Sequence, residues 1–155
     1  MESIKITSVD FDGLSGYELE IVMKHLVDIR SRSTTIFQNA DEPRTRTFLK
    51  GRREGIAKVY DSKGFAGIVM YDVVDTWYSN EPNVVEMLVL CVRKDVAGFG
   101  RVALGILETA ADFYGASRIF SGNAINEHPS VDNLYRKDGY KKYSTYYKEV
   151  QLDNG

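Results

Sequence analysis

The sequence predicts a single-domain α/β protein with a mixed, mostly antiparallel sheet flanked by helices. Segments with strand and helix patterns alternate along the chain, which is typical of a layered α/β fold. The length of 155 residues suits one domain, and 43% hydrophobic with 27% charged residues is typical of a globular protein. Because no repeat, low-complexity tract or linker interrupts the pattern, residues 1–155 are predicted to form one domain.

The first elements are a strand and a helix. Residues 3–9 (SIKITSV) alternate in hydropathy as a strand does, and residues 14–30 show apolar positions at helical spacing. Ser15 is the expected N-cap of this helix, and Glu18, three residues later, completes a capping box. A second helix is expected around residues 41–53, with Pro43 near its first turn.

The middle of the chain predicts strands. Residues 55–60 and 65–74 form a hairpin around the turn DSKG, and residues 84–92 (VVEMLVLCV) are apolar enough for a central strand buried on both faces. The remaining elements are a helix over 101–114 closed by Gly115, a strand over 117–122, a helix over 131–138 capped by Ser130, and a last strand over 140–150. The predicted order is β-α-α-β-β-β-α-β-α-β.

Gly98 and Gly100 flank one residue where the helix over 101–114 begins. The first N–H groups of a helix have no partner inside it and carry partial positive charge, so a bare glycine turn there suits a phosphate. The turn GFGRVA also fits a dinucleotide fingerprint, but the next strand lacks the required acidic residue, and no Gly-Lys-Ser/Thr follows for a P-loop. The alternative is that the glycines only permit close packing.

Three segments, in order, resemble the GNAT family of N-acetyltransferases. EMLVLCV resembles the family's fourth strand, GFGRVALGIL its pyrophosphate-binding turn and helix, and NLYRKDGYKKYSTYYKEV its late helix and last strand. The resemblance covers roughly residues 84–150 and implies the acyl-CoA N-acyltransferase fold. It also implies acetyl transfer from acetyl-CoA, without a metal, to an amine. Asp95 departs from the family, which usually has Arg or Gln there, although Arg93, Lys94 and Arg101 could offset its charge.

The resemblance implies which residues bind the coenzyme. Leu90 and Val92 would donate backbone hydrogen bonds to the pantetheine arm, and residues 97–102 would present N–H groups to the pyrophosphate. The full expected set is Leu90, Cys91, Val92, Ala97, Gly98, Phe99, Gly100, Arg101, Val102 and Tyr135. In a regular strand the Cys91 side chain would point away from that of Glu86, as a core residue rather than a nucleophile.

Three residues are candidates for catalysis. Glu86 lies in an apolar strand, where desolvation would raise its pKa toward a range useful for a base; the alternative is a glutamate that is simply hydrogen-bonded or solvated. His128 is the second candidate base, although a loop histidine before proline is often just exposed. Tyr135 matches the family's tyrosine that protonates the coenzyme A thiolate; the alternative is a tyrosine packed in the core.

Composition limits the partners. The net charge of -2 does not favour nucleic acid or anionic membranes, the longest apolar run is too short to span a bilayer, and no leader pattern begins the chain. The single cysteine suits a reducing cytoplasm. The basic segment 43–58 is expected to be a solvated face, with binding of an acidic acceptor or of nucleic acid as the alternatives. Several aromatic residues could line an acceptor pocket or a homodimer contact, or could serve packing: Trp77, Tyr78, Tyr143, Tyr146 and Tyr147.

The sequence therefore predicts an acetyl-CoA-dependent N-acetyltransferase that acts on a primary amine of an unidentified acceptor. Two alternatives stay open. One is a GNAT-like domain with impaired catalysis that binds coenzyme A or a protein, which Asp95 and a short phosphate loop motivate. The other is an unrelated α/β nucleotide-binding domain.

Overall fold

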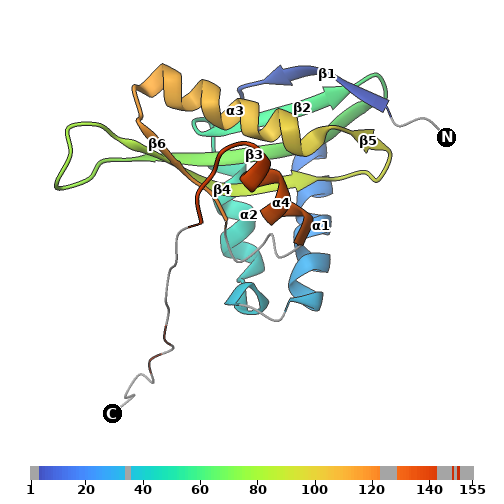
Figure 1. Ribbon diagram of the computed structural model, residues 1–155. Helices are drawn as coiled ribbons and strands as arrows, with labels where there is room; N and C mark the ends of the chain where they lie inside the picture. Colours follow the sequence, from blue (N-terminus) through green and yellow to red (C-terminus); the bar gives the residue numbers. More distant parts are fainter. Residues whose placement is uncertain (1–3, 34–35, 123–128, 143–147, 149, 151–155) are drawn as a thin grey trace, which may run out of the picture.

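The computed structural model describes residues 4–33, 36–122, 129–142, 148 and 150, with the backbone alone at residues 4, 36 and 129–132 (Figure 1). Its elements are β1 (Ile4–Asp10), α1 (Gly16–Arg32), the 3-10 helix η1 (Ile36–Asn39), α2 (Glu42–Gly51), β2 (Ile56–Asp61), β3 (Gly64–Val74), β4 (Asn83–Cys91), β5 (Val96–Ala97), α3 (Phe99–Tyr114), β6 (Arg118–Phe120) and α4 (Pro129–Lys137).

One mixed sheet organises the fold, and its described strands have the order β5-β1-β2-β3-β4-β6. Neighbours from β1 to β4 are antiparallel, whereas β5 runs parallel to β1 and β6 parallel to β4. The predicted mixed, mostly antiparallel sheet is confirmed. Figure 1 shows α3 along one face of the sheet and α1 with α2 on the other.

Each face of the sheet has its own core. Residues such as Val59, Val69 and Leu107 are buried between the sheet and α3, and Val22 and Ile68 are buried between the sheet and α1 with α2. The central strands are buried on both sides because their sequences are nearly continuous apolar runs. Packing on both faces holds in place the strands that carry the candidate site.

The predicted helix signals are confirmed at two termini. The Ser15 hydroxyl accepts a hydrogen bond from the Glu18 N–H at 3.2 Å, and the Glu18 carboxylate accepts one from the Ser15 N–H at 2.8 Å, which completes the capping box. Gly115 ends α3 in the left-handed region with φ 68°, where a residue with a side chain would be strained.

Several details differ from the predictions. Helix α4 begins at Pro129, so Ser130 lies inside the helix and is not its cap. Proline suits the first helical position because the N–H that it lacks would have no partner within the helix. Helix α3 begins two residues before Arg101, and the short elements η1 and β5 were not predicted. Residues 140–142 are irregular, and most of the predicted last strand lies outside the described residues.

None of the described helices has the length and hydropathy of a membrane span.

Candidate active site

The pairing between β4 and β6 stops partway along β4. Three pairs join the strands, the last between Val85 and Phe120, where β6 ends. Strand β4 continues to Cys91 without β6 beside it. We call the region bounded by residues 86–91 and residues 121–122 the fork. A strand edge without a neighbouring strand offers backbone groups to an extended ligand.

A β-bulge lies at the start of the fork. On β3, Met70 pairs with Leu88 and the next residue, Tyr71, pairs with Glu86, so Met87 is an extra residue without an opposite number. Such a bulge bends the strand and reverses which residues face each side of the sheet. Bulges are frequent next to active sites.

The bulge corrects the prediction made for a regular strand. After it, Leu88 and Leu90 face the core under α1 and α2, and Val89 and Cys91 face the core under α3. Glu86, before the bulge, points toward α4, on the α3 side of the sheet. Glu86 and Cys91 therefore share a face, and the prediction that they point apart is wrong. The bulge has no signal in the sequence, because the strand is apolar on both faces.

Glu86 and Tyr135 meet at the fork. The Tyr135 hydroxyl donates to Glu86 Oε2 at 3.1 Å, and the Gly122 N–H donates to the same oxygen at 2.8 Å. Glu86 is only 3% exposed. The structure thus brings together two of the three candidate catalytic residues. In both hydrogen bonds the Glu86 carboxylate is the acceptor. His128 lies outside the described residues.

Tyr135 is in a setting that keeps its hydroxyl protonated. Burial raises the pKa of Tyr135, and the charge and hydrogen bond of Glu86 raise it further, against a smaller opposing effect of Ser121. The Tyr140 ring lies 5.1 Å from the Tyr135 ring, centroid to centroid, and burial also raises the pKa of Tyr140. At neutral pH, Tyr135 is therefore a hydrogen-bond donor. Ser121, Gly122 and Tyr140 were not predicted, since only the three-dimensional fold places them here.

The glycine turn begins α3 as predicted, but its two glycines have different roles. Gly98 is the N-cap with φ 73° and without a side-chain cap, so its conformation requires glycine. A Cβ on Gly100 would lie 2.6 Å from Leu134 Cδ2, so Gly100 lets α4 approach α3 closely. This contact joins two helices, whereas the alternative predicted close packing of a strand against a helix, which stays a prediction.

The amides near this turn differ from those predicted for phosphate binding. The Val102 N–H donates to the Gly98 carbonyl at 3.1 Å, so the prediction that it is unpaired is wrong. The first four N–H groups, from Gly98 to Arg101, have no partner within the helix. Ala97 pairs with Lys5 in the β1–β5 ladder, and the Phe99 side chain is buried in the core.

The predicted pantetheine contacts on β4 also need correction. The Val92 N–H donates to the Ala66 carbonyl at 2.9 Å, so it points toward β3 and cannot bond a ligand in the fork. By alternation, the backbone of Leu90 also points toward β3, and that of Val89 and Cys91 points toward the fork. Burial raises the pKa of the Cys91 thiol, which suits a core residue.

Asp95 is neutralised by two cations. Arg93 Nε lies 3.0 Å from Asp95 Oδ1, and Lys63 Nζ lies 3.1 Å from Asp95 Oδ2. These contacts, that of Arg93 above all, lower the pKa of Asp95. Arg93 also pairs with the buried Asp61, which ties the β2–β3 turn to the segment before α3. Arg93 was a predicted partner of Asp95, and Lys63 was not.

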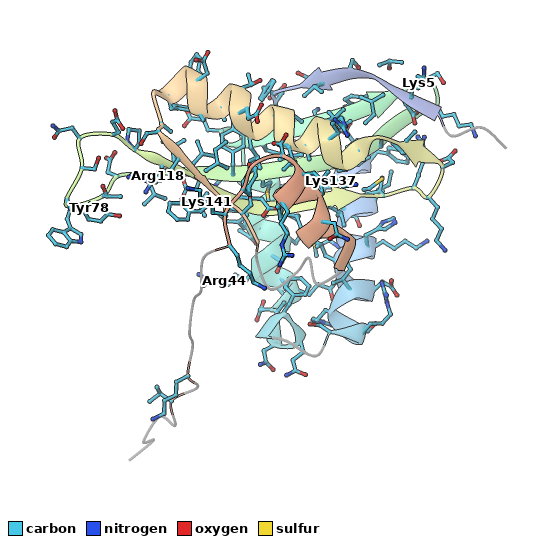
Figure 2. The ribbon with its side chains drawn as sticks, viewed as in Figure 1. Lys5, Arg44, Tyr78, Arg118, Lys137 and Lys141 are labelled. Carbon is cyan, nitrogen blue, oxygen red and sulfur yellow. The ribbon has the colours of Figure 1, made fainter. Side chains whose placement is uncertain are left out.

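The basic segment and two of the aromatic residues considered for the acceptor lie among the described residues. The basic segment is partly paired, since Arg46 contacts Glu20 and Arg53 Nη1 lies 4.0 Å from Asp12. Trp77 is 95% exposed, and Tyr78 lies at the projecting tip of the β3–β4 hairpin (Figure 2). The other three aromatic candidates lie outside the described residues. A small pocket, open to solvent, lies between α1, η1 and α2, and its lining includes Met23, Leu26 and Phe37.

Among the described residues, no cluster of three or more His, Cys, Asp or Glu side chains is arranged to hold a metal ion. The groups gathered at the fork are one carboxylate, one phenol, backbone amides and the N-terminus of α3. This arrangement can bind an extended, phosphate-bearing molecule and move a proton.

Comparisons with known proteins identify the fold. No protein-family model and no curated protein matches the sequence. Among solved structures, a ribosomal-protein-alanine N-acetyltransferase from Brucella melitensis biovar Abortus 2308 is similar with TM-score 0.64 and 15% identity, covering 92% of this chain and all of that one. An aminoglycoside acetyltransferase from an uncultured soil metagenomic sample has TM-score 0.60 and 13% identity over 94% and 100% of the chains. A transcriptional regulator from Bacillus halodurans C-125 has TM-score 0.66 and 13% identity over 94% and 99%.

At these identities the likeness concerns the fold, and it extends over nearly the whole of each chain. The chain therefore has the fold of the GNAT-type acetyltransferases.

Proposed function

We propose that the protein is an N-acetyltransferase that moves an acetyl group from acetyl-CoA to a primary amine. The observation that carries this proposal is the Glu86–Tyr135 hydrogen bond at the open end of β4, on an acetyltransferase fold. Among the described residues, a buried acid–base pair lies beside a strand edge that β6 leaves unpaired and beside the N-terminus of α3, which is more than packing requires. One cysteine in the chain favours a cytoplasmic location.

In this proposal, acetyl-CoA binds along the fork. The backbone groups of Val89 and Cys91 extend the sheet to the pantetheine arm, as an added strand would. The N–H groups from Gly98 to Arg101 and the positive end of the α3 dipole bind the pyrophosphate. Because Arg93 and Lys63 neutralise Asp95, its carboxylate repels the phosphates less than an isolated charge would.

Glu86 and Tyr135 then move protons. An acceptor ammonium must lose a proton before attack, which costs roughly 4–5 kcal/mol near pH 7 for an ordinary lysine. Glu86 takes this proton, directly or through water, and the neutral nitrogen then attacks the thioester carbon. The second proton that the nitrogen loses as the amide forms leaves to water. When the carbon–sulfur bond breaks, Tyr135 gives its proton to the thiolate. The hydrogen bond between the two residues lets Glu86 return a proton to Tyr135. His128 remains the second candidate for the base.

The fold does not determine which amine is the acceptor, so a panel of candidate amines is needed to identify it. The named activities of two similar structures suggest the first members, which are peptides with an N-terminal alanine and an aminoglycoside. Spermidine and a lysine-containing peptide with a blocked N-terminus complete the panel, because they test small polyamines and protein side chains.

Two measurements test the proposal. Calorimetry with acetyl-CoA is expected to show binding with a dissociation constant in the micromolar range, and thiol release upon addition of the amines is expected to identify an acceptor. The variants Glu86→Gln and His128→Ala distinguish the two candidate bases by their loss of turnover. Binding without thiol release from any amine would indicate a coenzyme-binding module, and absence of binding would contradict the proposal altogether.

A further inference from the structure

Arg52 contacts the bulge from the face of the sheet opposite to Glu86. It is the C-cap of α2, and its Nη2 lies 2.6 Å from the Tyr71 carbonyl oxygen and 3.5 Å from Met87 Sδ. Its guanidinium carbon lies 5.1 Å from the centre of the Phe48 ring. An arginine so placed is fixed on three sides.

The two polar contacts of Arg52 lie on the two sides of the bulge. Tyr71 is the residue of β3 that pairs with Glu86, and Met87 is the extra residue of β4. The chain also makes room for the guanidinium. Gly55 has φ 69°, and a Cβ on it would lie 2.5 Å from Arg52 Nη2, so a larger residue would push the guanidinium away.

The register of β4 decides where Glu86 points. Without the extra residue, Glu86 would lie on the same face as Leu88 and Leu90, under α1 and α2, and could not meet Tyr135. An apolar strand has little preference between the two registers, because both would bury leucine and valine side chains. A polar group that recognises the bulge can supply that preference.

We propose that Arg52 is a positioning residue for the Glu86–Tyr135 pair: by holding Tyr71 and Met87, it fixes the bulge that turns Glu86 toward α4. The effect of Arg52 on turnover rests on the proposed function, whereas its effect on the geometry of Tyr135 does not.

The test compares Arg52→Met with Arg53→Met. Methionine keeps most of the length of the side chain and removes the donors. Arg53 is the matched control, because it is the next residue, its side chain is 71% exposed, and its loss changes the net charge equally. Arg52→Lys keeps the charge but replaces the planar guanidinium, which has several donors, with a single ammonium group.

The first readout is the crystal structure of each variant, in which the contact between the Tyr135 hydroxyl and Glu86 reports the face to which Glu86 points. In Arg52→Met, loss of the bulge is expected to turn Glu86 to the face of Leu88 and Leu90, so that its hydrogen bond with Tyr135 is absent. Arg52→Lys is expected to show both orientations of Glu86, and Arg53→Met to match the wild type. A Glu86–Tyr135 hydrogen bond retained in folded Arg52→Met would overturn the inference.

The second readout is steady-state kinetics. In Arg52→Met, kcat is expected to fall about tenfold while KM for acetyl-CoA stays the same, because the acid–base pair and not the coenzyme site is disturbed. Equal kinetics in Arg52→Met and Arg53→Met would contradict the inference. A wild-type protein without transferase activity whose Glu86–Tyr135 contact still depends on Arg52 would refute the proposed function and support the positioning role. Should Arg52→Met not fold, the same two readouts on Arg52→Lys decide.

Discussion

Glu18 and Glu86 are both buried glutamates, and each accepts hydrogen bonds from a tyrosine hydroxyl and a backbone amide. For Glu18 these donors are Tyr60 and Ser15, and for Glu86 they are Tyr135 and Gly122. The settings differ. Glu18 lies in the first turn of α1, over β2, whereas Glu86 lies where β4 and β6 separate.

Lys58 adds to this difference. Its Nζ lies 3.2 Å from Glu18 Oε1, and both side chains are almost fully buried, so this carboxylate is part of an ion pair that joins α1 to β2. Glu86 instead shares its oxygen between an amide at the fork and a phenol from α4. Burial and hydrogen bonding therefore do not by themselves identify a functional carboxylate. The unpaired backbone edge beside it is what distinguishes Glu86.

The largest expected effect comes from breaking the Glu18 ion pair. Lys58→Met leaves Glu18 buried without its cation, and removal of one partner of a buried pair costs about 3 kcal/mol. Urea unfolding at pH 7 measures this loss. Lys63→Met, which removes the lysine of an exposed pair with Asp95, is the control and is expected to cost less than about 1 kcal/mol. Equal losses in the two variants would show that Glu18 is not held as described.

The two tyrosines sharpen the comparison. Tyr135→Phe is expected to reduce turnover about 100-fold, equivalent to about 2.7 kcal/mol in activation free energy, with the affinity for acetyl-CoA unchanged. Tyr60→Phe is expected to leave turnover unchanged and to reduce stability by about 1 kcal/mol. Steady-state kinetics measures the turnover of both variants, and urea unfolding measures their unfolding free energies. Turnover that responds equally to both substitutions would remove Tyr135 from the mechanism.

The smallest expected effect is on the pH dependence of stability. Burial alone would raise the pKa of Glu18, but hydrogen bonds from Tyr60, Ser15 and Lys58 outweigh it, and the net shift is downward. A folded pKa below the unfolded value of about 4.3 stabilises the protein above that pH, and the stabilisation disappears as the pH falls through the folded value.

The variant Glu18→Gln tests this direction. The difference in unfolding free energy between wild type and Glu18→Gln is expected to be constant from pH 7 to pH 5 and to shrink below about pH 4. Glu20→Gln, which removes an exposed carboxylate paired with Arg46, serves as control and should show a small difference throughout. A difference for Glu18→Gln that grows toward low pH would mean that its pKa is raised.

Much of the fold could be predicted from local signals. The capping box of Ser15 and Glu18, the C-cap at Gly115 and the apolar strands depend on residues close together in the sequence, so their patterns are visible there. The site could be predicted in part. Glu86 and Tyr135 were recognised one by one, but the residues that complete their surroundings, Ser121 and Gly122 among them, follow a short strand with little pattern of its own.

The sequence by itself determined the two amphipathic layers, the positions of most helix ends and the bare turn at Gly98, because short-range hydrogen bonds and backbone sterics act within a few residues. Only the tertiary structure decided the bulge at Met87, the face on which Glu86 lies and which amides of β4 and α3 remain open. The physical reason is that a strand buried on both faces has the same apolar pattern in either register. Its register is then chosen by distant groups, such as the carbonyl of Tyr71 and the guanidinium of Arg52, that meet only when the chain is folded.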